Sequence, residues 1–171
     1  MVYINDQFKF IFIENAKSGS TAILKALSQS LNVVIKRTPE LQNAHQTCDQ
    51  LKELYPDKWK NYLKVTTYRD PIERFKSSAN YPRHHQLRGI KSFEQFKTHI
   101  LSPEKCQYCI PQSEFLKEIN VIIHLNTIQI DYNSFCQQVG IPSVKVDTTN
   151  KNNQKIYSEK QLTELLLIVK I

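Results

Sequence analysis

The sequence predicts an α/β fold in which helices flank a mostly parallel central sheet. Short runs of β-branched and aromatic residues alternate along the chain with segments of helical periodicity. This alternation is typical of parallel strands joined by helices. The composition, with 40% hydrophobic and 23% charged residues, is that of a globular protein. The length of 171 residues fits one domain, and we expect a single domain over residues 1–171.

The chain is expected to open with a strand, a loop and a helix. Residues 8–13 (Phe-Lys-Phe-Ile-Phe-Ile) have the composition of a buried strand. Small and polar residues over 15–20 indicate a turn. Apolar residues then recur at helical spacing over 21–31 and define one buried face.

A second unit of the same kind follows. A short helix is expected over residues 47–54 and a strand over 62–68. Pro71 suits the first turn of a helix that reaches about residue 80, and Asp70 is its expected N-cap. Ligands of such folds bind where the carboxyl ends of parallel strands meet, so the loops after these two strands are the candidates for a site.

The remaining chain is expected to alternate helices with a third strand. These elements are, in order, an amphipathic helix over 92–100, a helix over 112–119, a strand over 121–125, a helix over 131–139 closed by Gly140, and a last helix opened by the capping-box residues Ser158 and Gln161. The last helix reaches the chain end without a stop signal, which favours a natural chain that continues further.

The charge of the chain favours anionic partners. Twenty-three Lys and Arg residues stand against 16 Asp and Glu, giving a net charge of +7. Nucleotides, nucleic acids and acidic glycans all fit this balance, and charge alone does not choose among them. Residues 1–13 lack the pattern of a signal peptide, and no apolar run approaches the roughly 20 residues of a membrane span. We therefore expect a cytoplasmic protein without an integral membrane segment.

The four cysteines give little support for a metal site. Cys106 and Cys109 form a C-x-x-C pair, but a structural zinc site usually needs a second pair. Cys48 and Cys136 stand alone. Reduced thiols and no metal are therefore expected, and the metal binding of Cys106 and Cys109 stays open.

Residues 14–21 (Glu-Asn-Ala-Lys-Ser-Gly-Ser-Thr) have the features of an anion-binding loop. Backbone N–H groups at a helix start, together with the helix dipole, attract phosphate. Lys17 adds a positive charge, and Ser20 and Thr21 add hydroxyl donors. The nucleoside triphosphate motif G-x-x-x-x-G-K-[ST] does not fit, because Lys17 precedes Gly19 and no glycine lies at the required upstream position.

Two segments resemble the nucleotide-binding motifs of sulfotransferases that use 3′-phosphoadenosine 5′-phosphosulfate (PAPS). The run Lys-Ser-Gly-Ser-Thr over 17–21 is similar to their 5′-phosphosulfate loop, although Ala16 stands where the family usually has proline. Residues 65–77 resemble their 3′-phosphate motif, with Arg69 after a strand and Ser77 eight residues later on a helix. The pair of motifs, in this order and each at a strand–helix junction, is specific.

Other stretches are similar to membrane-type carbohydrate sulfotransferases and their bacterial relatives. These stretches are residues 45–47, 111–116 and 149–151, and the resemblance covers roughly residues 8–160. It implies a three-layer P-loop-like fold, PAPS as co-substrate without a metal, and a hydroxyl acceptor that is a carbohydrate or another small compound. The chain ends where relatives usually continue their last helix, which puts part of the acceptor site in doubt.

The resemblance also implies roles for individual residues. Lys17 would stabilise charge on the oxygen that bridges sulfate and 5′-phosphate, and Arg69 with Ser77 would bind the 3′-phosphate. His45 is the candidate general base, with Glu14 as second choice. The residues implied to bind the nucleotide are Lys17, Ser18, Gly19, Ser20, Thr21, Arg69, Ser77, Asn150 and Lys151, with His84 and His85 near nucleotide or acceptor.

Ordinary roles and other functions stay open. Arg69 could be a surface ion-pair partner, Lys17 a solvated lysine and His45 a surface or capping residue. A nucleotide kinase would need the upstream glycine and magnesium, and a nucleic-acid-binding module would need aromatic residues interleaved with exposed basic ones. An inactive sulfotransferase also fits. The sequence indicates neither the acceptor nor the oligomeric state.

Overall fold

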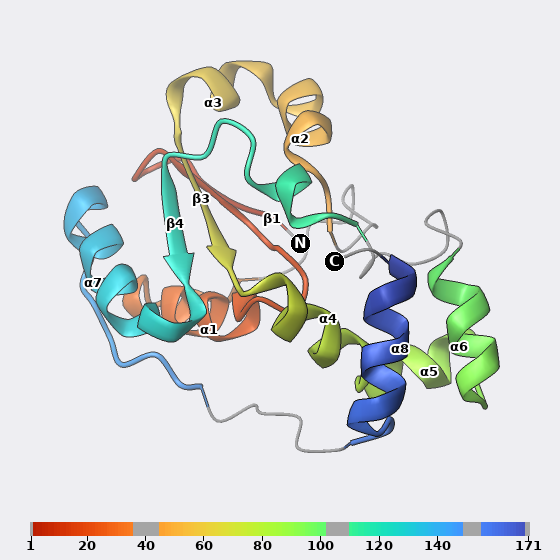
Figure 1. Cartoon of the computed structure of the whole chain (residues 1–171). Helices are drawn as coiled ribbons and strands as arrows, with labels where there is room; N and C mark the ends of the chain where they lie inside the picture. The colour runs from red at the N-terminus through yellow and green to blue at the C-terminus, as the bar shows by residue number, and fades with distance from the viewer. Residues whose placement is uncertain (1, 36–44, 102–109, 149–154, 170–171) are drawn as a thin grey trace. The chain divides into compact units, whose positions relative to one another are not determined.

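The computed structural model describes residues 2–35, 45–101, 110–148 and 155–169 (Figure 1). The chain divides into two compact units. A sheet unit comprises residues 1–69 and 111–150, and a helical unit comprises residues 70–110 and 151–171. Each unit is described by itself below.

The sheet unit contains a four-stranded mixed sheet of order β1-β2-β3-β4. Its strands are β1 (Val2–Asn5), β2 (Phe10–Ile13), β3 (Leu63–Tyr68) and β4 (Val121–His124). The strands β2, β3 and β4 are parallel, and β1 pairs antiparallel with β2. The predicted α/β class with a mostly parallel sheet is therefore confirmed, and the three predicted strands are present.

Helices and 3₁₀ turns connect the strands of this sheet in the described residues. The helices of the sheet unit are α1 (Ser20–Ser30), α2 (Cys48–Leu54), α3 (Pro56–Asn61) and α7 (Ile128–Val139), and its 3₁₀ turns are η3 (Gln112–Phe115) and η4 (Leu125–Thr127). The expected helix over 112–119 is therefore wrong beyond a single 3₁₀ turn. Glu118, with a φ of 57°, lies in the left-handed region, which an α-helix cannot contain.

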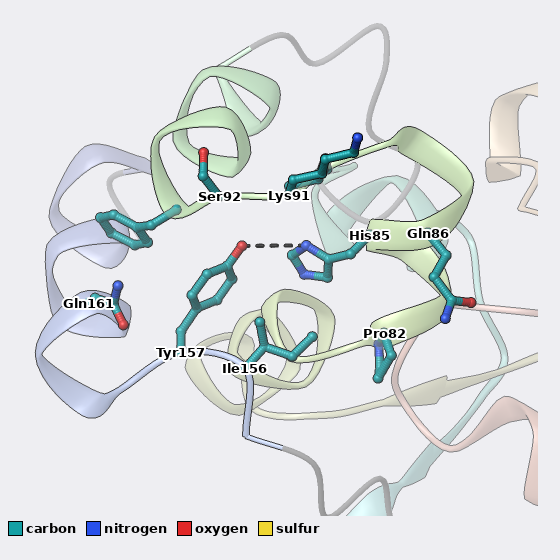
Figure 2. A pocket seen from close by; sticks show the side chains of 10 residues that line it. Pro82, His85, Gln86, Lys91, Ser92, Ile156, Tyr157 and Gln161 are labelled. Carbon is teal, nitrogen blue, oxygen red and sulfur yellow. Dashed lines mark hydrogen bonds between the residues drawn. The ribbon is translucent and has the colours of Figure 1, made fainter.

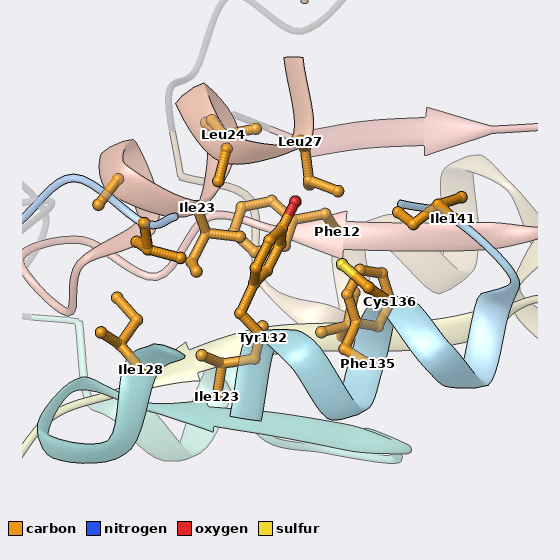
Figure 3. Packing of buried hydrophobic residues seen from close by; sticks show 14 of the residues in the cluster. Phe12, Ile23, Leu24, Leu27, Ile123, Ile128, Tyr132, Phe135, Cys136 and Ile141 are labelled. Carbon is orange, nitrogen blue, oxygen red and sulfur yellow. The ribbon is translucent and has the colours of Figure 1, made fainter. Parts of the chain in front are cut away.

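One face of the sheet packs on α1 and α7 (Figure 3). Phe12 of β2 and Ile123 of β4 meet Ile23 of α1 and Phe135 of α7 in this core, and all four are fully buried. The Tyr132 hydroxyl of α7 lies 2.7 Å from Ser30 Oγ of α1, which gives its buried oxygen a partner. This core holds α1 against the sheet, and the loop over residues 14–19 joins the carboxyl end of β2 to the start of α1.

The opposite face of the sheet carries a buried lysine against α3. Lys64 Nζ of β3 donates a 3.1 Å hydrogen bond to Trp59 O and lies 5.7 Å from the Trp59 ring centroid. The Trp59 indole donates in turn to Glu118 Oε2 at 2.8 Å. Helical segments thus contact both faces of the sheet.

The helical unit contains α4 (Pro71–Ala79), α5 (Pro82–Arg88), α6 (Phe93–Ile100) and α8 (Glu159–Val169). Asp70 caps α4 by accepting from the Glu73 N–H, as predicted. Ser158 and Gln161 form the predicted reciprocal cap at the start of α8. The core of this unit is Phe75, Ala79, Phe96, Ile100, Tyr157, Leu162 and Leu165.

None of the helices in the described ranges combines the length and apolarity that a bilayer-spanning helix requires.

Candidate functional site

The two sequence motifs meet at the carboxyl edge of the sheet. The first loop follows β2 and Arg69 follows β3, and these strands are parallel neighbours. Arg69 Nη1 lies 3.5 Å from the carbonyl oxygen of Lys17, the geometry of a weak hydrogen bond across 52 residues of sequence. Two cationic side chains from separate motifs therefore share one edge of the sheet, where α/β proteins bind ligands.

The backbone of the first loop is shaped for an anion. Lys17 and Gly19 have φ values of 61° and 95°, whereas Ser18 between them does not lie in the left-handed region. Such alternation turns successive N–H groups toward one side, which creates an anion-binding concavity. Gly19 is the N-cap of α1 and has no side chain to cap the first turn, and that turn contains no acidic residue. The Ala22 N–H donates to the Gly19 carbonyl oxygen at 3.0 Å, so the N–H groups that precede it in the turn are the candidates for binding a ligand.

Gly19 is required by both conformation and space. Its φ of 95° is rarely adopted by residues with a side chain, and a β-carbon at this position would lie 2.8 Å from Leu125 Cδ1. Leu125 begins η4, directly after β4. The loop thus passes close to the carboxyl end of β4 as well.

The hydroxyl groups of Ser18, Ser20 and Thr67 form a hydrogen-bonded cluster that stabilises the loop. Ser18 Oγ and Ser20 Oγ lie 2.6 and 2.7 Å from the Asn15 carbonyl oxygen, and 2.5 and 2.7 Å from Thr67 Oγ1 of β3. Since a carbonyl oxygen only accepts, both serines donate to it, and Thr67 donates to one of them. The Ser18 and Ser20 hydroxyls are thereby engaged within the protein. These two residues would serve a bound anion through their backbone N–H groups, whereas Thr21 is exposed.

Lys17 carries an altered pKa. Burial, and secondarily the positive charge of Arg69, lower the pKa of Lys17 from 10.5 to about 8. Both causes disfavour the charged ammonium, and a bound anion would reverse the second cause. Perturbed groups of this kind are frequent at functional sites.

His45 lies beside the loop. Its Nδ1 is 3.1 Å from the carbonyl oxygen of Glu14, the first residue after β2. Because that oxygen accepts, Nδ1 carries the proton and Nε2 is the basic nitrogen of the neutral ring. The side chain of Glu14, the second-choice base, is buried at 8% exposure.

The amide side chains of Asn15 and Gln112 connect the loop to Arg69, and neither is among the predicted site residues. Gln112 Oε1 accepts from Asn15 Nδ2 at 3.0 Å and from the Arg69 N–H at 3.1 Å. Gln112 Nε2 donates to the Arg69 carbonyl oxygen at 2.8 Å. The segment 111–116 is among the stretches that resemble sulfotransferases. Nothing in its sequence indicates that Gln112 contacts Arg69, which lies 43 residues away.

The remaining predicted residues lie in the helical unit or outside the described residues, so their relation to this edge stays a prediction. Ser77 lies half-buried on α4, in the helical unit. Asn150 and Lys151, and also Cys106 and Cys109, lie outside the described residues. The described ranges hold no group of three or more His, Cys, Asp or Glu side chains that would bind a metal ion.

His85 lies in a pocket of the helical unit with a volume of about 410 Å³ (Figure 2). Its Nε2 donates to the Ala79 carbonyl oxygen at 2.7 Å, and its Nδ1 faces the Tyr157 hydroxyl at 3.4 Å. The ring packs against Phe96 at 5.0 Å between centroids. These contacts tie α5 to α6 and to the segment that leads into α8, so they give His85 a structural role within this unit.

Comparisons with protein-family models, with curated proteins and with solved structures found no significant match to the chain.

Proposed function

We propose that the chain is a sulfotransferase that moves a sulfuryl group from PAPS to a hydroxyl of a carbohydrate or another small acceptor. One observation carries the proposal: Lys17 and Arg69, from two motifs 52 residues apart, lie together at one sheet edge. Two cationic groups at one edge suit a nucleotide with an anionic group at both its 5′ and 3′ positions. Helical segments on both faces of the sheet support a three-layer, P-loop-like fold for the sheet unit.

The groups at this edge would have separate roles in nucleotide binding and catalysis. The backbone N–H groups over 18–21 would hold the 5′-phosphate, and the Arg69 guanidinium would bind the 3′-phosphate with two parallel hydrogen bonds. Lys17 would stabilise the negative charge on the oxygen that leaves sulfur. His45 Nε2 would accept the proton of the acceptor hydroxyl as its oxygen forms the new bond to sulfur. The products are the sulfated acceptor and 3′-phosphoadenosine 5′-phosphate (PAP).

The hydroxyl cluster favours this reaction over a kinase reaction. A P-loop kinase uses the hydroxyl that follows its lysine as a magnesium ligand. Here that hydroxyl belongs to Ser18, which is fully buried and bonded to Asn15 O and Thr67 Oγ1. A magnesium ion would have to displace these contacts.

Calorimetric titration with PAP, ADP and ATP tests the nucleotide assignment. We expect the tightest binding for PAP, and a loss of about 10- to 100-fold in PAP affinity for Arg69→Ala, since the contact is a charged one. Arg88→Ala removes the same charge at an exposed position and is the matched control. Equal affinity for the three nucleotides would refute the proposal, and a salt-dependent affinity for nucleic acid instead would support the nucleic-acid-binding alternative.

The catalytic assignment is tested with a PAPS-dependent sulfation assay over a panel of carbohydrate acceptors. His45→Ala should reduce kcat by about 10²-fold or more, while PAP affinity stays within twofold of the unsubstituted protein. A variant that keeps its full rate would remove His45 from the mechanism and direct attention to Glu14.

A further inference from the structure

Gln112 makes three hydrogen bonds that join the two loops of the proposed site. It begins η3, where the chain re-enters the sheet unit, and its side chain is 8% exposed. The Oε1 atom accepts from the Arg69 N–H and from Asn15 Nδ2, and Nε2 donates to the Arg69 carbonyl oxygen. Both functional atoms of the amide are therefore used, and both contact Arg69.

The hydrogen bonds from Gln112 take the place of those that a neighbouring strand would make to the backbone of Arg69. The ladder of β3 with β2 ends at Thr66, and its ladder with β4 ends at the Tyr68–His124 pair. Arg69 thus lies one residue beyond the sheet, with its N–H and carbonyl outside the ladder. The Gln112 amide pairs with both groups in the way a neighbouring peptide would, which fixes the backbone from which the guanidinium projects.

Asn15 extends the connection to the phosphate loop. Its Nδ2 donates to Thr67 O at 2.9 Å as well as to Gln112, and its own carbonyl oxygen accepts from the Ser18 and Ser20 hydroxyls. Asn15 is fully buried. A continuous chain of hydrogen bonds, buried at Asn15 and partly buried at Arg69, therefore runs from the loop, through Asn15 and Gln112, to the backbone of Arg69.

We propose that Gln112 is a positioning residue that sets the distance between the phosphate loop and Arg69. The inference rests on the proposed function, because its consequence is selectivity for a nucleotide with both a 5′- and a 3′-anionic group. The spacing of these groups in the ligand is fixed by the ribose, so both subsites bind only when the protein holds a matching spacing. Gln112 would not touch the nucleotide itself.

Two substitutions separate the hydrogen bonds from the volume of the side chain. Gln112→Glu keeps the size but replaces the Nε2 donor with an oxygen that faces the Arg69 carbonyl, so this pair becomes repulsive. Gln112→Ala removes all three bonds. Gln137→Ala, at an exposed position of α7, is the control for the loss of a glutamine. Thermal unfolding of each variant establishes that it is folded.

The first measurement is hydrogen exchange at the Arg69 amide, without ligand. We expect exchange to accelerate by tenfold or more in both Gln112 variants and to stay unchanged in Gln137→Ala, since the acceptor of this N–H is lost or repositioned. The second is the ratio of affinities for PAP and for AMP, which lacks the 3′-phosphate. This ratio should fall by about tenfold in both Gln112 variants, with AMP affinity within twofold.

A double-substitution cycle connects the effect to Arg69. Gln112→Ala should cause no further loss of PAP affinity in an Arg69→Ala background, because Gln112 acts through Arg69. Folded Gln112 variants with the original PAP-to-AMP ratio would overturn the inference, as would an unaltered exchange rate at Arg69. If the unsubstituted protein itself shows no preference for PAP, the proposed function fails, and the exchange rate alone then decides whether Gln112 positions Arg69.

Discussion

Lys17 is held at the site at a cost to stability. Burial and the charge of Arg69 disfavour its ammonium in the folded state, whereas the unfolded chain exposes it to water. We expect Lys17→Met to raise the free energy of unfolding at pH 7 by about 1 kcal/mol, because the methionine side chain carries no charge into this environment. Urea denaturation of the two proteins measures the difference, and Lys25→Met, at an exposed position of α1, is the control.

The folded and unfolded pKa values of Lys17 determine the direction in which this stability difference changes with pH. The folded pKa of about 8 lies below the ordinary value of 10.5, so the unfolded chain binds more protons between these values. The stability of the unsubstituted protein should therefore rise relative to Lys17→Met as the pH increases from 8 to 10.5. A stability difference that is constant over this range would contradict the lowered pKa.

The deprotonation of Lys17 also predicts how nucleotide binding depends on pH. Above a pH of about 8 the free protein loses the Lys17 charge, so PAP affinity should fall by up to tenfold per pH unit. Lys17→Arg keeps a positive charge throughout, and its affinity should be nearly independent of pH between 7 and about 10. Calorimetric titrations with PAP at four pH values measure how the affinity of each protein changes with pH. An equal change in both proteins would mean that a group other than Lys17 causes the pH dependence.

Gly19 allows a comparison of conformational strain with steric overlap. Gly19 and Gly140 both have positive φ, but only Gly19 has a neighbour, Leu125 Cδ1, within 3 Å of the position of an added β-carbon. Gly140→Ala should cost about 1 kcal/mol of unfolding free energy, and Gly19→Ala should cost about 1–3 kcal/mol more. Similar losses in chemical denaturation would show that the loop moves away from Leu125 without cost.

At the scale of the elements, the carboxyl end of β3 supports the loop through one hydroxyl. Thr66 and Thr67 are adjacent, fully buried and hydrogen-bonded, but Thr66 donates to Ile13 O in the sheet, whereas Thr67 contacts Ser18 and Ser20. Valine at either position should cost about 1–2 kcal/mol of stability. Only Thr67→Val should also weaken PAP binding, which calorimetry measures, and an equal loss of affinity in Thr66→Val would assign the effect to general destabilisation.

Elements with strong local signals were predictable from the sequence, and others were not. The strands over 10–13 and 63–68 are rich in β-branched and aromatic residues, and α4 has both a cap and an N-terminal proline. The strand β1 and the helices α3 and α5 were not predicted, and neither helix has a side chain that caps its first turn. The helix α7 begins at Ile128 rather than at 131, because the Asp131 carboxylate accepts from the His124 N–H and the Thr127 hydroxyl before the helix.

The candidate site was predictable in its residue types but not in its internal contacts. The order of Lys17 and Gly19, and the place of Arg69 after a strand, were visible in the sequence. The inward orientation of the Ser18 and Ser20 hydroxyls was not, since it depends on Thr67, 49 and 47 residues away. The role of Gln112 depends on an equally distant partner. Such contacts follow from strand order, which local sequence does not encode.

At the scale of the whole molecule, the two units have separate cores. The core on one face of the sheet includes Phe12 and Phe135, and the core of the helical unit includes Phe96 and Tyr157. The sequence contains one tryptophan, Trp59, which is buried in the sheet unit. Its fluorescence therefore reports the unfolding of the sheet unit alone, whereas circular dichroism reports helices of both units.

This difference predicts how a core substitution affects unfolding. Phe96→Ala removes a fully buried ring and should destabilise the helical unit by about 3–5 kcal/mol. If each unit is stabilised mainly by its own core, the helical transition measured by circular dichroism will move to lower denaturant, while the Trp59 transition will stay within experimental error. Phe135→Ala, in the core of the sheet unit, should instead move the Trp59 transition. Coincident shifts of both signals in Phe96→Ala would show that the units unfold as one cooperative structure, because the loss of one core would then destabilise the whole chain.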